Sequence, residues 1–190
     1  MDCLIQPPAK KRKTISLSSE DRETIIMGEK LSDMHINYAQ ELLKRQFPSL
    51  SGLESTLLVA KEGFKATETE NKLQILHTRK DHWITASNIN CAADIINVYD
   101  SLYSSVDKTT ENVLYNLFPL STRDKPVIKV HLYQRQKGVK DCGLFAIASA
   151  TSIALECDLL LKIKYNQAAL RPHLLTCIKN DNLVMFPTLL

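Results

Sequence analysis

Hydrophobic positions in the N-terminal third of the chain recur at helical spacing. Ser18 and Ser32 are residue types that favour helix N-caps, and acidic residues follow both of them. After Ser32, apolar residues recur three or four positions apart from residue 34 to residue 47, and Pro48 ends the run. We therefore expect ordered structure to begin near Ser18 and a clear helix to follow Ser32, with its apolar stripe in the core.

In the middle of the chain the pattern changes to short apolar runs rich in β-branched and aromatic residues. Such runs predict strands, here at residues 73–78, 82–87, 95–100 and 127–133. Residues 79–81 are polar and predict a turn between the first two. A charged segment at about 107–118 predicts a helix before the last strand.

The C-terminal part predicts two more helices. Residues 142 to about 157 carry small and apolar side chains on all sides, as in a buried helix. A last helix is expected at about 165–179. The order of helix, strands, buried helix and closing helix predicts an α+β domain with a central mixed or antiparallel sheet.

Length and composition fit one folded domain. The 190 residues are 44% hydrophobic and 24% charged, which is ordinary for a globular protein. We divide them into a disordered basic tail at 1–17 and a domain at 18–190. No apolar run is long enough for a membrane helix or a signal peptide, so we expect an intracellular protein with no membrane partner. The five cysteines include no C-x-x-C pair, which favours free thiols and no metal site.

The net charge of +3 lies entirely in the first 13 residues, where Lys10, Lys11, Arg12 and Lys13 outweigh Asp2. The remaining chain has equal numbers of basic and acidic residues, so a nucleic-acid partner is not expected. The basic cluster resembles a short nuclear localisation signal and predicts the nucleus, with the cytoplasm otherwise. A solvated basic tail is the alternative.

Cys142 stands at the start of the predicted buried helix, between Asp141 and Gly143. A thiol is a weak nucleophile, but the amides and dipoles of a helix N-terminus favour the reactive thiolate. A glycine at 143 lets another chain segment or a substrate approach closely. A cysteine before a glycine is more often structural, so a catalytic reading needs partner residues.

His82, Asp100 and Gln136, which all precede Cys142 in the chain, could be those partners. His82 opens one predicted strand and Asp100 ends the next, so an antiparallel pairing would bring them together, and the carboxylate would orient the imidazole. Gln136, six residues before Cys142, could donate its side-chain amide to an oxyanion together with the Cys142 backbone N–H. Gln134 is a less well-placed alternative. Each residue alone also has an ordinary reading as a surface, turn or loop residue.

Together these residues resemble the ubiquitin-like-protein proteases of the deSUMOylase type, over about residues 25–190. The motifs are His82-Trp83, Val98-Tyr99-Asp100-Ser101-Leu102 and Gln136 followed by Asp141-Cys142-Gly143. Their order of His, Asp, Gln and Cys is distinctive, because papain-like enzymes have the order Gln, Cys, His, Asn. The resemblance implies a papain-like architecture of the ubiquitin-like protease type, in which a buried helix carries the nucleophile.

The resemblance also implies roles. Cys142 would be the nucleophile, His82 the base, Asp100 its orienting partner and Gln136 the oxyanion donor. The family cleaves after the C-terminal Gly-Gly of SUMO or a related modifier through a thioester, without a cofactor. The expected partners are such a modifier and its conjugates, bound by a monomeric enzyme.

The chain departs from the family near its first helix. Members that act on SUMO carry a Trp-Leu-x-Asp motif whose tryptophan lies over the Gly-Gly tail, whereas this chain has Lys30-Leu31-Ser32-Asp33. Its single tryptophan, Trp83, would pack beside the catalytic histidine, in the core, or both. Lys30, Asp33 and Trp83 are therefore the candidate substrate-binding residues.

Other readings stay open. The residues around His82 and Cys142, with Arg171-Pro172-His173-Leu174-Leu175, resemble divergent protease-like genes that mobile elements carry in animal genomes. Because the tryptophan is lost, a catalytically weak or inactive module that binds a ubiquitin-like protein is the main alternative. Acyl transfer from the same thioester is another, without a visible acyl-donor site. Three further cysteines are read as buried or incidental thiols: Cys91, Cys157 and Cys177.

Overall fold

The computed structural model describes residues 15–61, 64–67, 71–78, 81–92, 94–120, 124–155 and 162–189. Most of the predicted tail, including the basic cluster at 10–13, lies outside these residues, as does Cys157. Leu17 is buried in the core and Ile15 packs against it. The folded part of the chain therefore begins before the boundary predicted at residue 18.

The first two helices begin where their capping residues predicted. Helix α1 (Ser19–Ile26) starts after Ser18, whose hydroxyl accepts from the backbone N–H of Asp21 at 3.1 Å in a capping box. Helix α2 (Asp33–Gln46) starts after Ser32 and ends two residues before Pro48. The apolar side of α2 is buried, as its spacing predicted.

The five described strands form one mixed sheet in the order β1-β2-β3-β4-β5. Its strands are β1 (Ser51–Gly52), β2 (Lys72–Thr78), β3 (His82–Ser87), β4 (Ile95–Asp100) and β5 (Val127–Leu132). The central pairs β2–β3 and β3–β4 are antiparallel, and the outer pairs β1–β2 and β4–β5 are parallel. The four predicted strands are confirmed within one residue, whereas β1 and the short helix α3 (Thr56–Val59) were not predicted.

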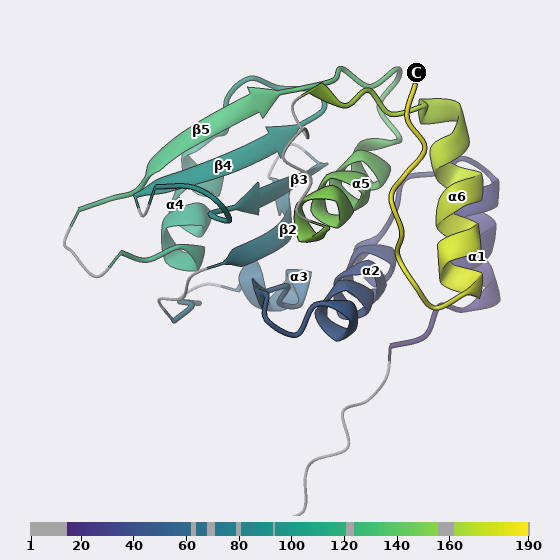
Figure 1. The fold of residues 1–190 in the computed structure, drawn as a ribbon, viewed down its shortest axis with the longest axis horizontal. Coiled ribbons are helices and arrows are strands. Elements are labelled where there is room, and N and C mark those ends of the chain that lie inside the picture. The colour runs from purple at the N-terminus through teal and green to yellow at the C-terminus, as the bar shows by residue number, and fades with distance from the viewer. Residues whose placement is uncertain are drawn as a thin grey trace, which may run out of the picture.

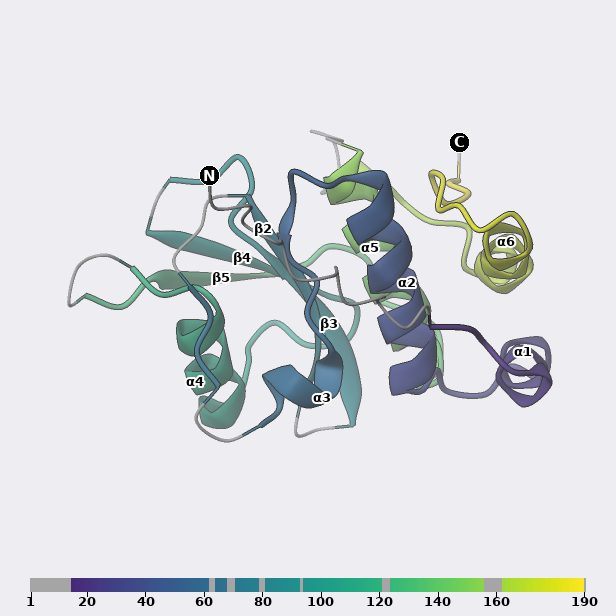
Figure 2. The same cartoon turned by 90° about the horizontal axis from the view of Figure 1, so that it is seen from below.

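Helices cover both faces of the sheet (Figures 1 and 2). Helix α4 (Lys108–Leu117) and α3 lie on one face, above a smaller apolar core. Helices α5 (Cys142–Ala154) and α2 lie on the other face, and α1 and α6 (Gln167–Lys179) form an outer layer beyond them. The larger core lies between the sheet, α2, α5 and α6.

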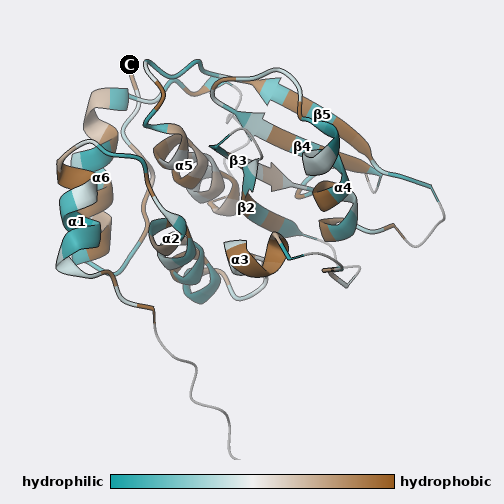
Figure 3. Ribbon diagram, turned by 180° about the vertical axis from the view of Figure 1, so that it is seen from behind, coloured by the Kyte–Doolittle hydropathy of each residue, from teal (hydrophilic) through white to brown (hydrophobic). Residues whose placement is uncertain are grey.

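Every residue of α5 is buried, as its composition predicted, and Figure 3 shows it as a largely apolar helix. Its polar side chains are satisfied internally: the hydroxyls of Ser149 and Thr151 each donate to a carbonyl four residues back. The Thr85 hydroxyl of β3 donates to the Ala146 carbonyl at 2.8 Å and joins the central strand to this helix. The helix ends at Ala154, earlier than the predicted residue 157.

The C-terminal segment closes the outer layer. Residues 182–189 run back beside α6 (Figure 1), and Tyr165 forms a β-bridge with Thr188. Leu183 and Phe186 of this segment are buried in the larger core. No helix in the described part of the chain is long and apolar enough to cross a membrane.

Candidate active site

The fold brings the predicted residues to one end of the sheet. His82 is the first residue of β3 and Asp100 is the last residue of β4. Because these neighbouring strands are antiparallel, the two residues lie at the same end of the sheet. Cys142 is the first residue of α5, which packs across β3. Two consecutive strands and a helix more than 40 residues further along the chain thus meet at one corner of the molecule.

His82 and Asp100 form a buried pair. The ring Nε2 lies 2.7 Å from the Asp100 Oδ1, and both side chains are 2% exposed. The same oxygen accepts from the backbone N–H groups of Leu102 at 2.7 Å and Tyr103 at 2.9 Å. These amides hold the carboxylate in place, so the carboxylate in turn fixes the orientation of the imidazole.

The pair has a strong electrostatic effect on the ring. Burial by itself lowers the pKa of His82, but the hydrogen bond with Asp100 and the interactions with Cys142 outweigh it and raise the pKa from 6.5 to about 9. His82 is therefore protonated at neutral pH. A protonated imidazole beside a thiol stabilises a thiolate on that sulfur.

The second ring nitrogen of His82, Nδ1, is the one that is free to take part in proton transfer. Among the described residues, it is the one buried side-chain nitrogen or oxygen that has no hydrogen-bond partner of standard geometry. Cys142, itself 2% exposed, acts on the same ring. With Nε2 held by Asp100, Nδ1 is the atom that can exchange a proton with the Cys142 sulfur or with a reacting group.

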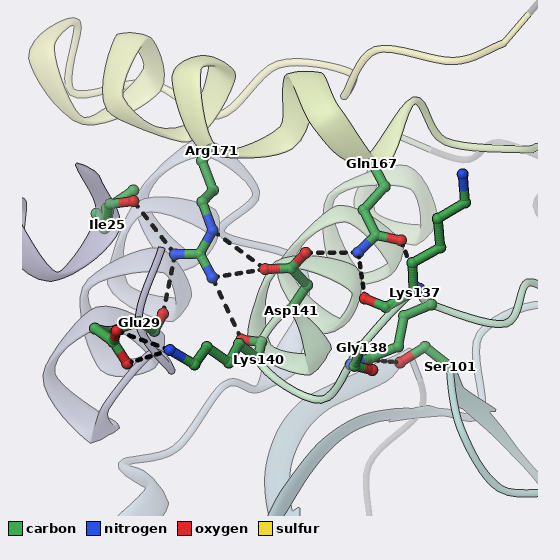
Figure 4. A network of polar contacts seen from close by, with 10 residues as sticks. Ile25, Glu29, Ser101, Lys137, Gly138, Lys140, Asp141, Gln167 and Arg171 are labelled. Carbon is green, nitrogen blue, oxygen red and sulfur yellow. Dashed lines mark hydrogen bonds and ion pairs between the residues drawn. The ribbon is translucent and has the colours of Figure 1, made fainter. Parts of the chain in front are cut away.

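Gln136 is buried in the loop that leads to Cys142, and Ser101 holds it. The Ser101 hydroxyl donates to the Gln136 side-chain oxygen at 2.6 Å, and the Gln136 backbone N–H donates to the Ser101 carbonyl at 2.9 Å. The side-chain nitrogen donates to the Gly138 carbonyl at 3.0 Å, next to Ser101 in Figure 4. These contacts fix the direction of the amide, as an oxyanion donor requires.

Gln134, the alternative to Gln136, has a structural role. Its side-chain nitrogen donates to the Tyr165 carbonyl at 3.0 Å, and its oxygen accepts from the Tyr165 backbone N–H at 2.7 Å. Both ends of its amide are therefore committed to the start of the C-terminal region.

The segment before α2 lies across the N-terminus of α5. A Cβ added to Gly143 would lie 2.9 Å from the Leu31 Cβ, which is closer than side chains pack. The Trp83 indole N–H donates to the Leu31 carbonyl at 2.9 Å. The predicted need for a glycine at 143 is explained by Leu31, and Leu31 sets the position of its neighbour Lys30.

Lys30 and Tyr103 lie close to the His82 and Cys142 side chains. Lys30 pairs with Asp81, and this contact, with smaller contributions from Cys142 and Tyr103, raises the pKa of Lys30. The Tyr103 ring meets the His82 ring edge-on, with 5.3 Å between centroids. Both side chains are partly exposed, whereas Cys142 is buried.

The other two candidate substrate-binding residues are held elsewhere. The Asp33 carboxylate accepts from the Thr56 hydroxyl at 2.8 Å and joins α2 to α3. Trp83 is buried in the larger core, where its ring packs against His77, with 4.7 Å between centroids. The aromatic ring recorded against His82 is that of Tyr103, which the sequence reading did not single out.

Two other cysteines, Cys91 and Cys177, lie within the described residues, both outside the candidate site. Cys91 is partly buried and accepts from the Asn97 side-chain amide, and Cys177 is buried in the core. Burial raises the pKa of both thiols. Within the described residues, no cluster of His, Cys, Asp and Glu could hold a metal ion.

Comparison with solved structures defines the class of fold. This chain has the fold of the Ulp1-type cysteine proteases, which confirms the predicted α+β architecture with a buried helix that begins at Cys142. No protein-family model matches the sequence, and no curated protein matches it.

Several of the similar structures are of Ulp1. Its protease domain in complex with Smt3, the yeast ortholog of SUMO, has a TM-score of 0.67 and 14% identity over 92% of this chain and 90% of that one. Ulp1 with its catalytic cysteine oxidised to a sulfonic acid has a TM-score of 0.70 and 14% identity, over 90% and 87%. A de-sumoylating protease has a TM-score of 0.60 and 12% identity, over 87% and 86%. At these identities the likeness is one of fold.

Proposed function

We propose that this protein is a cysteine-type peptidase or isopeptidase that cleaves after the C-terminal Gly-Gly of SUMO or a related ubiquitin-like modifier. The observation that carries the proposal is the buried His82–Asp100 pair beside Cys142 at the N-terminus of α5. The fold shared with SUMO proteases supports the choice of substrate class.

In the acylation step, the Cys142 thiolate attacks the carbonyl carbon of the terminal glycine. The negative charge that develops on the carbonyl oxygen is stabilised by the Gln136 amide and the Cys142 backbone N–H. As the C–N bond breaks, His82 gives its Nδ1 proton to the leaving amine, and a thioester remains.

In the deacylation step, water replaces the amine. The neutral His82 ring takes a proton from water as the water oxygen bonds to the thioester carbon. The C–S bond then breaks, and the Cys142 thiolate and the protonated His82 are restored. The modifier leaves as a carboxylic acid, which loses its remaining proton to solvent. Asp100 keeps the ring in one orientation through both steps.

Labelling with activity-based probes tests the proposal. Purified protein is incubated with SUMO, NEDD8 and ubiquitin that carry a C-terminal vinyl sulfone, and adducts are measured by mass spectrometry. We expect an adduct with at least one probe, lost in Cys142→Ser and kept in Cys91→Ser. The Cys91 variant is the matched control, because Cys91 is a partly buried thiol outside the site.

The result that contradicts the proposal is equally defined. No adduct with any probe, together with no cleavage of peptides that contain Gly-Gly, would exclude the peptidase. If a modifier still bound, with the same affinity in wild type and Cys142→Ala, the chain would be a binding module of this fold. The departure at Lys30 is the observation that favours this second function.

A further inference from the structure

Asp141 occupies the N-cap position of α5 and yet does not cap the helix. An aspartate in this position commonly accepts from an amide of the first turn. Here the side chain makes no such bond, and the backbone, at φ −101° and ψ 6°, is not in the extended conformation typical of an N-cap. The amides at the start of the nucleophile's helix therefore have no capping carboxylate.

The Asp141 carboxylate is instead bound by two residues of α6, as Figure 4 shows. Its Oδ1 accepts from Arg171 Nε at 3.1 Å and Nη2 at 2.6 Å. Its Oδ2 accepts from Gln167 Nε2 at 2.6 Å. Since the two residues are four apart on one helix, they hold the carboxylate from the same side.

The same two residues also bind the surrounding backbone. The Arg171 Nη1 donates to the carbonyls of Ile25 at 3.3 Å and Glu29 at 2.9 Å, at the end of α1. Gln167 exchanges hydrogen bonds with the backbone N–H and carbonyl of Lys137, at 2.8 Å and 2.9 Å. Helix α6 thus holds the loop at 137–141 at both ends.

We propose that Arg171 and Gln167 are positioning residues that keep the Asp141 carboxylate away from the first turn of α5. The amides of that turn then remain free to stabilise negative charge on the Cys142 sulfur. In the part of the inference that rests on the proposed function, they also stabilise the oxyanion. Arg171 also neutralises the one carboxylate adjacent to the nucleophile in the sequence.

The charged groups around the Cys142 thiol determine the sign of the effect. The cationic groups that interact with Cys142 are His82 of β3 and Lys30 of the α1–α2 connection, and Asp100 of β4 and the Tyr103 ring contact His82. Asp141 opposes the thiolate, and its charge is paired with Arg171 of α6. Without Arg171, an unpaired carboxylate free to cap α5 would disfavour the thiolate on both counts.

Alkylation of Cys142 tests the inference. The rate of modification by iodoacetamide is followed between pH 4 and 10 (roughly the range in which cysteine thiols titrate) by mass spectrometry of the peptide that contains Cys142. In Arg171→Met we expect the midpoint of the profile to rise by about one pH unit. Arg171→Lys should retain part of the wild-type behaviour, because it keeps the charge but loses the planar fork.

A matched control separates this effect from loss of an ion pair in general. Arg45 binds Asp181 with two hydrogen bonds of 2.8 Å, between α2 and the end of α6. Arg45→Met removes another arginine–aspartate pair, one that is more exposed and lies away from the site, and should leave the alkylation midpoint unchanged. Thermal unfolding of each variant confirms that the measured protein is folded.

The decisive variant is the double substitution Asp141→Ala with Arg171→Met. Because it removes the carboxylate that Arg171 restrains, it should return the midpoint to near its wild-type value. A folded Arg171→Met protein with an unchanged midpoint would overturn the inference. So would a double variant as impaired as the single one, since Arg171 would then only support the loop.

Two further features make the test robust. If Arg171→Met does not fold, the Asp141→Ala variant decides the question. Its alkylation midpoint should not rise. A rise would overturn the inference, because it would show that the ion pair itself sustains the thiolate. Alkylation needs no modifier, so the outcome does not depend on whether the protein cleaves SUMO or any relative.

Discussion

Two ion pairs start from consecutive residues, Asp81 and His82, at the beginning of β3. His82 pairs with Asp100, and both side chains are 2% exposed. Asp81 pairs with Lys30, and these side chains are 71% and 41% exposed. Asp81 also has a backbone φ of 52°, in the left-handed region, whereas His82 belongs to a regular strand.

The difference in burial separates two functions. Charges removed from water interact strongly, so the inner pair can raise the pKa of His82 to about 9 and hold one ring orientation. The outer pair competes with water and salt, and its geometry is easily changed. Under the proposed function, the inner pair would serve catalysis, and the exposed outer pair would be the place where substrate preference can change without loss of catalysis.

The largest effect is expected from Asp100→Asn. It keeps the shape of the side chain but removes the charge that orients the protonated ring, so kcat/KM should fall by about 10³–10⁴-fold. Steady-state cleavage of a modifier fused to a fluorophore measures the loss. A fall of less than tenfold in a folded variant would show that the inner pair is not part of the catalytic machinery.

The next effect concerns the oxyanion. Gln136→Ala should lower kcat by about 10²–10³-fold with little change in KM, because the amide acts on the charged intermediate. Gln134→Ala is the matched control from the same loop, since its amide binds only the Tyr165 backbone among the described residues. Equal losses of kcat for the two variants would argue against a special role for Gln136.

The pH dependence of cleavage tests the role of His82 in the inner pair as the proton donor. His82 keeps its proton until its pKa of about 9, so above that pH the acylation step loses its acid and kcat/KM should fall about tenfold per pH unit. Alkylation of Cys142 needs no acid and should not fall in the same range. Divergent profiles are the expected result, and parallel ones would contradict the assignment of His82 as the proton donor.

The same proton affects stability. Since the pKa of His82 in the folded protein exceeds its reference value of 6.5, the stabilising contribution is complete below pH 6.5 and is lost as the pH rises towards about 9. Thermal unfolding should show a decline across this window. The decline should be smaller in Asp100→Asn, which lacks the charged partner.

The smallest effect is expected at the outer pair. Lys30→Met should hardly change thermal unfolding, because an exposed ion pair contributes little. Lys30→Trp introduces the aromatic residue of the SUMO-acting family members and should lower KM for SUMO more than it changes kcat. Lys44→Met, which removes another exposed pair on α2, is the control. An unchanged KM in Lys30→Trp would show that residue 30 does not contact the modifier.

Much of the fold was predictable because its main elements carry strong local patterns. The strands β2 to β5 are short apolar runs, and α5 is apolar on every side, so their positions followed from the sequence. The strand β1 has only two residues, and no periodicity can be recognised over that length. The end of α5 was misplaced because the apolar run continues beyond Ala154.

The site was predictable only in part, for a similar reason. His82, Asp100, Gln136 and Cys142 share a chain order and spacing that a reader can recognise, and the structure brings the parts together. Tyr103 and Arg171 stand outside the motifs of these four residues, and Ser101 stands within one, but the contacts of all three depend on how loops and α6 pack. Tertiary packing likewise decided that Trp83 turns towards His77 and Leu31.

The contact between Gly143 and Leu31 also has an evolutionary consequence. The space for a Cβ at 143 is already filled by Leu31, so the two positions cannot vary independently. Any residue other than glycine at 31 keeps the Cβ that alanine at 143 would meet, so a descendant with alanine there would need a backbone shift at Leu31, next to Lys30. Under the proposed function, changes at the start of α5 and changes in substrate preference at Lys30 would then be linked through a single pair of residues.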